Sequence, residues 1–253
     1  MSYKAVVSDW NGTLFEYSTD EVQNKKIAYT ILYDAIYAVL KGRVWRIGDI
    51  IKLLKTRGEL NRRLQQYYDG ERCLWEVYEA FNENILKGKS VSIVMRAIDK
   101  YAKESADKVD RRIIRPIQTV HKDGKRTAIL SVSYDYSIRR ILEEADYPDV
   151  FDDIVANTLQ TDSGKVVGLT LDIYGRKPEV LIAEFFEKRG LRENNTLYLG
   201  DSEDDEPIAE ILVPGNFIVP FLASDEFKQR LASKYKAFVP ESERDLMKYL
   251  QSR

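Results

Sequence analysis

One predicted strand stands far from all the others in this chain. Tyr3–Ser8 reads as a short buried strand, and the next segment with strand character begins only at Arg126. In between, Phe15–Asp110 carries apolar residues at three- and four-residue spacing, which indicates helices. After Arg115, strands and helices alternate, a pattern typical of a parallel sheet covered by helices on both faces. We therefore expect an α/β core that is interrupted after its first strand by a helical insertion.

The second part of the chain supplies the remaining elements of this core. The expected strands are Arg126–Ser131, Phe151–Ala156, Asn157–Thr161, Val166–Leu171, Thr196–Leu199, Phe217–Val219 and Ala237–Val239. The expected helices between them are Ile117–Lys122, Tyr136–Glu144 and Pro178–Arg189. The turn residues Asp162-Ser163-Gly164-Lys165 predict a hairpin between the third and fourth of these strands.

Composition and charge restrict the class of protein. The net charge of −2 gives no global positive field of the kind that favours nucleic acid. The single cysteine, Cys73, excludes an internal disulfide and fits a reducing compartment. The longest apolar stretch, Ile27–Leu40, contains Asp34 and is too short to span about 30 Å of hydrocarbon, and the first strand leaves no room for a signal peptide. We expect a cytoplasmic protein with no nucleic-acid partner and no membrane partner; the oligomeric state stays open.

Two carboxylates stand where predicted strands end. Asp9 follows the first strand and precedes a Gly12-Thr13 turn, and Asp201 follows the strand Thr196–Leu199 and opens the acidic run to Asp205. In open parallel sheets, ligands bind beyond the carboxyl ends of the strands, so we expect the two carboxylates to lie together. Clustered carboxylates suit a hard cation such as Mg²⁺. The alternative, a solvated acidic helix start, explains the run to Asp205 but not its partner Asp9.

Two further residues follow the same order along the chain. Ser131 ends a predicted strand with a hydroxyl suited to a phosphate oxygen, and Lys177 places a cation just before a predicted helix. Taken alone, each is an ordinary loop serine or surface lysine. Their order and spacing relative to Asp9 and Asp201 indicate a common site.

The ordered set resembles a known family. Asp9-Trp10-Asn11-Gly12-Thr13, Ser131, Lys177 and Gly200-Asp201-Ser202-Glu203-Asp204-Asp205 resemble the four motifs of the haloacid-dehalogenase-like hydrolase superfamily. The hairpin at Gly164 and the later Lys177 are similar to the phosphoserine-phosphatase-like branch. The implied fold is a Rossmann-like parallel sheet core, residues 1–14 and 111–253, with an α-helical cap, residues 15–110, inserted after the first strand.

The resemblance implies a Mg²⁺-dependent phosphatase that forms an aspartyl-phosphate and acts on a small phosphorylated metabolite. The implied catalytic residues are Asp9 as nucleophile, Asn11, Ser131 and Lys177. The implied phosphate-binding residues are Asn11, Gly12, Thr13, Ser131, Val132 and Lys177. The implied Mg²⁺ ligands are Asp9, the backbone carbonyl of Asn11, Asp201 and, directly or through water, Asp205.

Asn11 departs from the pattern of the family. Its phosphatases usually carry a second aspartate at this position, which protonates the leaving oxygen; an amide cannot transfer a proton. General acid–base assistance is worth about 10²–10⁴-fold in rate. Three outcomes stay open: substrates with good leaving groups, another proton donor such as Asp204, Glu203 or a cap residue, or a catalytically weak phosphate- and metal-binding regulatory protein. Dehalogenation is disfavoured, because dehalogenases of this superfamily work without metal.

The helical insertion contains a basic stretch. Lys41–Arg63 holds eight basic and two acidic residues. Such a stretch would attract anionic substrates if it faced a phosphate site, but a solvated helix face is the favoured interpretation. Nucleic-acid binding by this stretch is the least favoured one, given the net charge.

Overall fold

The computed structural model describes residues 3–16, 20–69, 74–170 and 173–253, so Cys73 lies outside the described residues. The chain divides into two compact units. The first comprises Met1–Thr19, Ser105–Asn157 and Asp172–Arg253, and the second comprises Asp20–Glu104 and Thr158–Leu171. None of the helices in the described ranges combines the length and the apolar character that a bilayer span requires.

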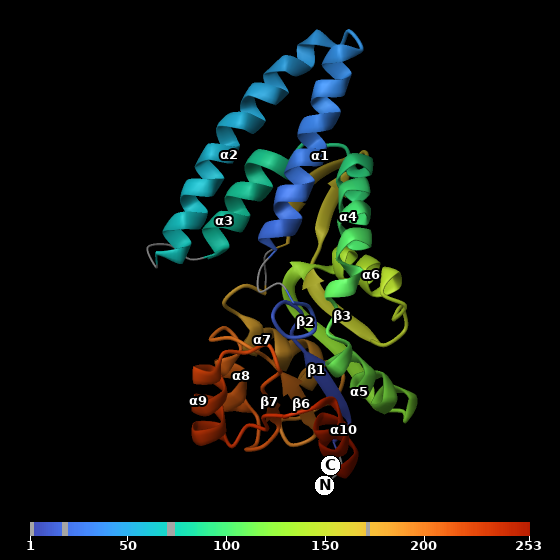
Figure 1. Cartoon of the computed structure of the whole chain (residues 1–253), viewed down its shortest axis with the longest axis vertical. Coiled ribbons are helices and arrows are strands. Elements are labelled where there is room, and N and C mark those ends of the chain that lie inside the picture. The colour runs from blue at the N-terminus through green and yellow to red at the C-terminus, as the bar shows by residue number, and fades with distance from the viewer. Residues whose placement is uncertain (1–2, 17–19, 70–73, 171–172) are drawn as a thin grey trace. The chain divides into compact units, whose positions relative to one another are not determined.

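A five-stranded parallel sheet forms the centre of the first unit (Figure 1). The strand order is β3 (Asp153–Asn157), β2 (Arg126–Tyr134), β1 (Ala5–Ser8), β6 (Thr196–Leu199) and β7 (Phe217–Ile218). The isolated first strand of the sequence is thus the central strand, and it pairs in parallel with both β2 and β6. All four of its residues are buried. The predicted α/β class with a parallel sheet is confirmed.

Helices complete the first unit. They are α5 (Arg111–Lys122), α6 (Asp135–Glu144), α7 (Lys177–Val180), α8 (Glu206–Ile211), α9 (Asp225–Tyr235) and α10 (Glu243–Ser252), with a 3₁₀ turn η3 (Ala106–Lys108) and a π-helical segment η4 (Leu181–Glu187). Val7 and Leu130, on neighbouring strands, belong to one buried cluster with Phe185 of η4, Ile208 of α8 and Leu231 of α9. This packing covers one face of the sheet.

Several predicted elements have other bounds in the structure, and one predicted strand is not formed. β2 continues to Tyr134, three residues beyond the predicted end, and its pairing with β3 shifts between Leu130 and Tyr134. α5 begins at Arg111 and contains Pro116, because its buried apolar face outweighs the missing hydrogen bond. The predicted strand Ala237–Val239 is wrong: Phe238 forms only an isolated bridge with Ile218.

The second unit is mostly helical. Its elements are α1 (Glu21–Leu40), η1 (Val44–Arg46), α2 (Ile47–Tyr68), α3 (Leu74–Phe81), the π-helical segment η2 (Asn82–Leu86), α4 (Val91–Ser105, whose last residue counts with the first unit), β4 (Leu159–Asp162) and β5 (Lys165–Leu169). α1 and α2 form a long antiparallel hairpin that extends past the end of α3 (Figure 1). The helical character predicted for Phe15–Asp110 is therefore confirmed in the described residues. Its role as a cap stays a prediction.

The β4–β5 hairpin belongs to the helical unit. The predicted turn is present, with positive φ angles of 48° at Ser163 and 75° at Gly164. The Gly88 N–H donates to the Val166 carbonyl (2.7 Å), and the Val166 N–H donates to the Lys89 carbonyl (2.8 Å). The compact units therefore group the hairpin with the helices, whereas the predicted domain boundaries place it in the core segment. Those boundaries stay a prediction.

Val166 and its neighbour Val167 provide a matched test of this packing. Val166 is fully buried and Val167 is 44% exposed. We expect Val166→Ala to lower the free energy of unfolding by about 2 kcal/mol, and Val167→Ala by less than about 0.5 kcal/mol. Denaturant unfolding followed by circular dichroism measures both. Equal losses for the two variants would contradict the packing of the hairpin on the helices.

Candidate active site

The loop after β1 holds Asp9 at the carboxyl end of the sheet. The Asp9 N–H donates to the Leu199 carbonyl of the neighbouring strand β6 (2.9 Å). The Phe15 N–H donates to the Trp10 carbonyl (3.0 Å), and the two rings stack with centroids 5.2 Å apart. The loop is therefore closed on itself by backbone bonds and ring packing, which fixes the direction of the Asp9 side chain.

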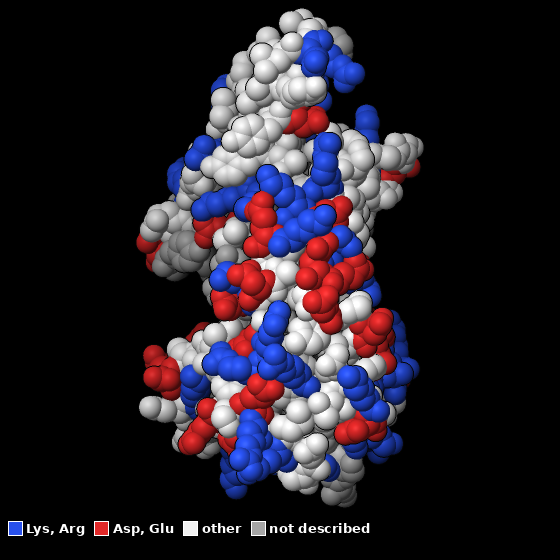
Figure 2. All heavy atoms as spheres, turned by 45° about the vertical axis from the view of Figure 1, so that its right-hand side comes forward, with Lys and Arg blue, Asp and Glu red and all other residues white. Residues whose placement is uncertain are grey.

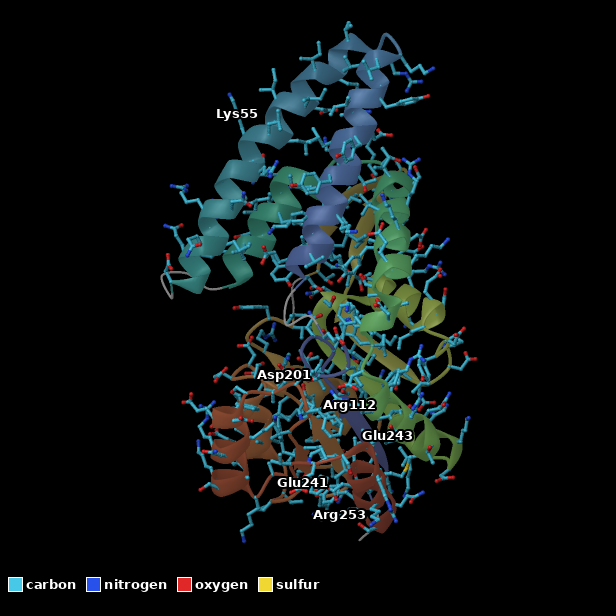
Figure 3. All side chains as sticks on the ribbon, in the orientation of Figure 1. Lys55, Arg112, Asp201, Glu241, Glu243 and Arg253 are labelled. Carbon is cyan, nitrogen blue, oxygen red and sulfur yellow. The ribbon has the colours of Figure 1, made fainter. Side chains whose placement is uncertain are left out.

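Gly12 marks the point where the two strand ends meet. Its φ is +72°, and a Cβ atom at this position would lie 2.1 Å from Asp201 Oδ2. The hydroxyl of the next residue, Thr13, donates to Asp201 Oδ1 (2.7 Å). Asp201, labelled in Figure 3, follows β6 at the same edge of the sheet. Only glycine allows this approach, and Thr13 orients the carboxylate.

Lys177 lies between two buried carboxylates. Its Nζ is 3.0 Å from Asp9 Oδ2 and 2.7 Å from Asp205 Oδ1, and all three residues are at most 5% exposed. Lys177 is the first residue of α7, so it begins the helix rather than preceding it. Burial lowers the pKa of Lys177, but the charges of Asp205 and Asp9 outweigh burial and raise the pKa above its usual value. The ammonium therefore stays charged.

Asp205 accepts hydrogen bonds on both oxygens. Besides Lys177, the Tyr198 hydroxyl donates to Oδ1 (2.8 Å). The Asp201 N–H and the Ser202 hydroxyl donate to Oδ2 (3.2 Å and 3.3 Å). A carboxylate engaged in this way positions Lys177 and has little capacity left for a direct metal bond. Sequence reasoning missed Tyr198; the signal was a phenol in an otherwise apolar strand, which needs a partner when it is buried.

The acidic residues fit a divalent cation. Asp9, Asp201 and Asp205 offer oxygen atoms that all lie within 4.8 Å of one another. Asp9 Oδ1 is buried and has no hydrogen-bond partner among the described residues. Three carboxylates face the single ammonium of Lys177, so two negative charges remain uncompensated if all three ionise. Oxygen-only ligands with this charge are those that Mg²⁺ prefers.

The pKa values of two of these carboxyls show the cost of burying negative charge at this site. Burial raises the pKa of Asp9 well above its usual range; Lys177 partly offsets the rise, while Asp205 and Asp201 add to it. Burial likewise raises the pKa of Asp201 to about 7, and the charge of Asp205 contributes. Both carboxyls therefore hold a proton to higher pH than an ordinary aspartate, and a bound cation would compete with those protons.

Other predicted site residues are less closely connected. Asn11 is buried and forms a bridge with Phe15. Ser131 lies inside β2, not at its end as predicted, and its Oγ accepts from the Ser133 N–H (3.1 Å). The Val132 carbonyl accepts from the side-chain amide of Asn157 in β3. In the part of the chain that the structure describes, these hydrogen bonds of Ser131 and Val132 stay within β2 and β3 and do not reach Asp9 or Lys177.

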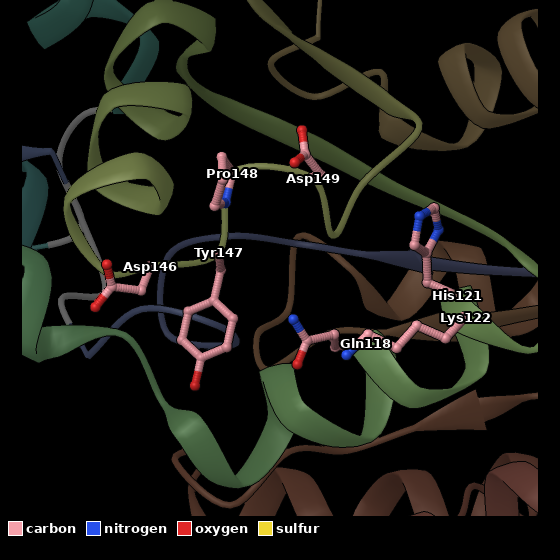
Figure 4. A pocket seen from close by; sticks show the side chains of 7 residues that line it. All are labelled: Gln118, His121, Lys122, Asp146, Tyr147, Pro148 and Asp149. Carbon is pink, nitrogen blue, oxygen red and sulfur yellow. The ribbon is translucent and has the colours of Figure 1, made fainter.

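A separate hollow lies away from this site. It has a volume of about 410 Å³ and is lined by the end of α5 and the loop before β3, including His121 and Tyr147 (Figure 4). These segments precede β2 and β3, so the hollow lies near the amino ends of the strands. Asp9 and Asp201 follow the carboxyl ends of β1 and β6, at the opposite edge. The hollow is therefore not part of the candidate active site.

Comparison with protein families identifies the chain. The model of the haloacid dehalogenase-like hydrolases matches residues 6–210, a range that includes all the residues listed above. The chain belongs to this family. It is therefore a hydrolase of the haloacid dehalogenase-like type, which confirms the resemblance seen in the four motifs. No curated protein sequence matches the chain significantly.

Solved structures share the fold of this hydrolase. A substrate-bound phosphoserine phosphatase is 17% identical, with a TM-score of 0.60, and the match covers 100% of this chain and 99% of that one. A phospho-aspartyl intermediate analogue of phosphoserine phosphatase has the same identity and TM-score, with 99% and 100% covered. A protein of unknown function from Bordetella pertussis Tohama I is 14% identical, with a TM-score of 0.66 and 94% and 98% covered. At these identities the likeness establishes the fold.

Gly12 offers a test of the cation site. We expect Gly12→Ala to abolish the stabilisation of the protein by Mg²⁺, because the new Cβ displaces the Asp201 carboxylate. At a Mg²⁺ concentration about 100 times the Kd, the wild type gains about 2.7 kcal/mol. Thermal unfolding with and without Mg²⁺ measures the gain. Gly48→Ala, at a helical glycine with no atom near the added Cβ, is the control. An unchanged gain in Gly12→Ala would contradict the assignment.

Proposed function

We propose that this hydrolase is a Mg²⁺-dependent phosphatase that acts on a small phosphorylated metabolite through an aspartyl-phosphate intermediate. The observation that carries the proposal is the buried Lys177 between Asp9 and Asp205, with Asp201 beside them. This arrangement presents a carboxylate nucleophile and a cation to an anionic group at one edge of the sheet. The single cysteine supports a reducing, cytoplasmic location.

Asp9 performs the bond-making step in this proposal. An oxygen of its carboxylate attacks the phosphorus atom, and the bond from phosphorus to the leaving oxygen breaks, so that the electron pair departs with that oxygen. Water then attacks the phosphorus of the aspartyl-phosphate, which restores the Asp9 carboxylate and releases inorganic phosphate. Lys177 offsets the repulsion between the anionic nucleophile and the anionic substrate. Ser131, Gly12 and Thr13 are proposed to help hold the phosphoryl group.

The cation would be held mainly by Asp9, Asp201 and the backbone carbonyl of Asn11, with Asp205 acting through water. When bound, Mg²⁺ supplies charge neutralisation for the transferring phosphoryl group. The hydrogen bonds from Thr13 to Asp201 and from Tyr198 to Asp205 orient these carboxylates for that role. The preference for Mg²⁺ over other divalent ions rests on the oxygen-only ligands.

Asn11 defines the preferred class of substrate. Its amide cannot protonate a leaving oxygen, so substrates that leave as stable anions, such as acyl or aryl phosphates, are favoured. Of the two acidic residues suggested as replacements, Glu203 is held by Arg230 (3.0 Å). Of these two residues, Asp204 is therefore the proposed proton donor for poorer leaving groups.

The first test is phosphate release from an aryl phosphate, with and without Mg²⁺. We expect Mg²⁺-dependent release by the wild type and a loss on the order of 10⁴-fold or more in Asp9→Asn, because the nucleophile is removed. Asp149→Asn, at an exposed loop position, is the control and should retain wild-type rates. Metal-independent release, or release that survives Asp9→Asn, would refute the mechanism.

Asn11→Asp tests the missing proton donor. We expect the variant to gain about 10²–10⁴-fold in kcat/KM on alkyl phosphates, and much less on aryl phosphates, since only poor leaving groups need a proton. Asn61→Asp, an exposed position on α2, is the matched control. The ratio of the two kcat/KM values is the readout. A ratio that is the same in wild type and Asn11→Asp would show that Asn11 does not limit turnover.

Asn11 also favours one alternative, a catalytically weak phosphate- and metal-binding regulatory protein. This alternative keeps Lys177 and Asp201 as binding groups but assigns no turnover to Asp9. Mg²⁺ and phosphate would raise the unfolding temperature, with no phosphate release from good or poor leaving groups. The aryl phosphate assay therefore separates the two functions.

A further inference from the structure

The α1–α2 hairpin exposes much apolar surface near the turn that connects its two helices. Of the ten large apolar side chains that are exposed in the described residues, eight lie between Tyr29 and Leu54. We define the hairpin tip face as the seven of these nearest the connecting turn: Tyr33, Tyr37, Leu40, Val44, Ile47, Ile51 and Leu54. Their exposed fractions run from 46% at Ile47 to 78% at Leu40. Gathered apolar surface of this kind marks an interaction site.

The two helices contribute to the same face of the hairpin. The guanidinium of Arg57 on α2 lies 5.4 Å from the ring centre of Tyr29 on α1, and both residues line one hollow of about 160 Å³. Steps of three or four residues along a helix stay on one side of it. Towards the turn, these steps lead through Tyr33, Tyr37 and Leu40 on α1 and through Leu54, Ile51 and Ile47 on α2. The exposed apolar side chains therefore adjoin across the two helices.

The buried residues of α1 lie on the side opposite its exposed tyrosines. Ile27, Ile31, Ala35 and Ala38 are buried and form the stripe that packs inside the helical unit. The exposed tyrosines thus have no role in the core of this unit. Something other than folding accounts for the apolar character of the hairpin tip face.

Cations surround the hairpin tip face, and its few carboxylates are already paired. The exposed cations Lys41, Arg43, Lys52, Lys55 and Arg57 have no carboxylate partner among the described residues. Asp34 and Asp49 both bind Arg46 (3.4 Å and 2.7 Å). Lys55 points away from the hairpin in Figure 3. In Figure 2 the tip of the hairpin, at the top of the view, shows mainly white and blue surface. The face is therefore apolar with an uncompensated positive border.

We infer that the hairpin tip face docks on the surface of a lipid bilayer that contains anionic lipids. Aliphatic side chains such as Leu40 and Ile47 would enter the boundary between headgroups and acyl chains, and Lys52 and Lys55 would meet lipid phosphates. Tyrosine is enriched at this depth of the membrane–water interface. The inference replaces the expectation of no membrane partner, concerns the bilayer surface alone, and does not depend on the proposed phosphatase chemistry.

The charge and the apolar character of the hairpin tip face argue against two other binding partners. A second copy of the chain would bring two positive borders together, and like charges across a contact are costly. A nucleic acid would satisfy Lys52 and Lys55 but would leave Leu40, Val44 and Ile47 without an apolar partner. An anionic bilayer satisfies both the charges and the apolar side chains.

Vesicle flotation of the whole chain tests the inference. The vesicles contain phosphatidylcholine alone or phosphatidylcholine mixed with phosphatidylglycerol, at low and at high salt. We expect binding to the mixed vesicles at low salt, release at high salt, and no binding to phosphatidylcholine alone. Binding to neither kind of vesicle would overturn the inference.

Two sets of variants divide the apolar and the charged contributions. Lys52→Gln with Lys55→Gln should weaken binding roughly five-fold for each lysine. Leu40→Asn with Ile47→Asn should weaken it by about ten-fold or more for each side chain that enters the bilayer. The controls are Leu222→Asn and Lys188→Gln, which change an exposed apolar and an exposed basic residue of the other unit. All substituted positions are exposed, and circular dichroism melting checks that each variant folds.

Three results would assign the hairpin tip face otherwise. Unchanged vesicle binding in Leu40→Asn with Ile47→Asn would show that apolar insertion plays no part. Concentration-dependent dimerisation that this variant removes, without vesicle binding, would assign the face to a second copy of the chain. Binding of single-stranded RNA that only the lysine variant removes, again without vesicle binding, would assign it to nucleic acid. Each of these results overturns the inference.

Discussion

The candidate site depends on one buried ammonium held between two carboxylates. Removing an ion from water costs several kcal/mol even after the protein relaxes, and the positive charge of Lys177 offsets part of that cost for the buried Asp9 carboxylate. Lys177 itself is only 4% exposed, and the negative charges of Asp205 and Asp9 keep its ammonium protonated. Because the three residues come from the loop after β1, from α7 and from the loop after β6, this arrangement requires those segments to meet at one edge of the sheet.

The backbone around this ion pair is shaped to permit the meeting. β1 is the central strand, and its pairing with β6 places the loop after Ser8 next to Asp201. Gly12 removes the side chain that would collide with the Asp201 carboxylate, and Gly200 does the same for Asp205, where an added Cβ would lie 2.6 Å from the Asp205 Cβ. The close approach of carboxylates is thus a property of the backbone, and the excess negative charge that it creates is what makes a divalent cation fit.

Sequence reasoning reached as far as local patterns extend. The buried strand before Asp9, the strand before Asp201 and the turn at Ser163-Gly164 are each encoded within a few residues, and the structure has all three. The Tyr198 hydroxyl reaches Asp205 across a strand end and a loop, and Val166 pairs with Lys89 of a distant segment of the chain. No helical or strand periodicity relates these partners, so no local signal identifies them. Ser131 shows the same limit, because pairing with β3 continues β2 past the residue where the apolar run ends.

Asn11 and the hairpin tip face are two further places where the chain departs from what folding alone requires. Position 11 is buried and lies two residues after Asp9, so an aspartate there would add a further buried charge. The asparagine avoids that cost and gives up proton transfer in exchange. At the tip, Leu40 and Ile47 expose apolar surface that contributes nothing to the core, next to cations that no carboxylate in the described residues balances. A sequence selected only for folding would place polar residues there. The inferred docking of the hairpin tip face on a lipid bilayer accounts for this composition.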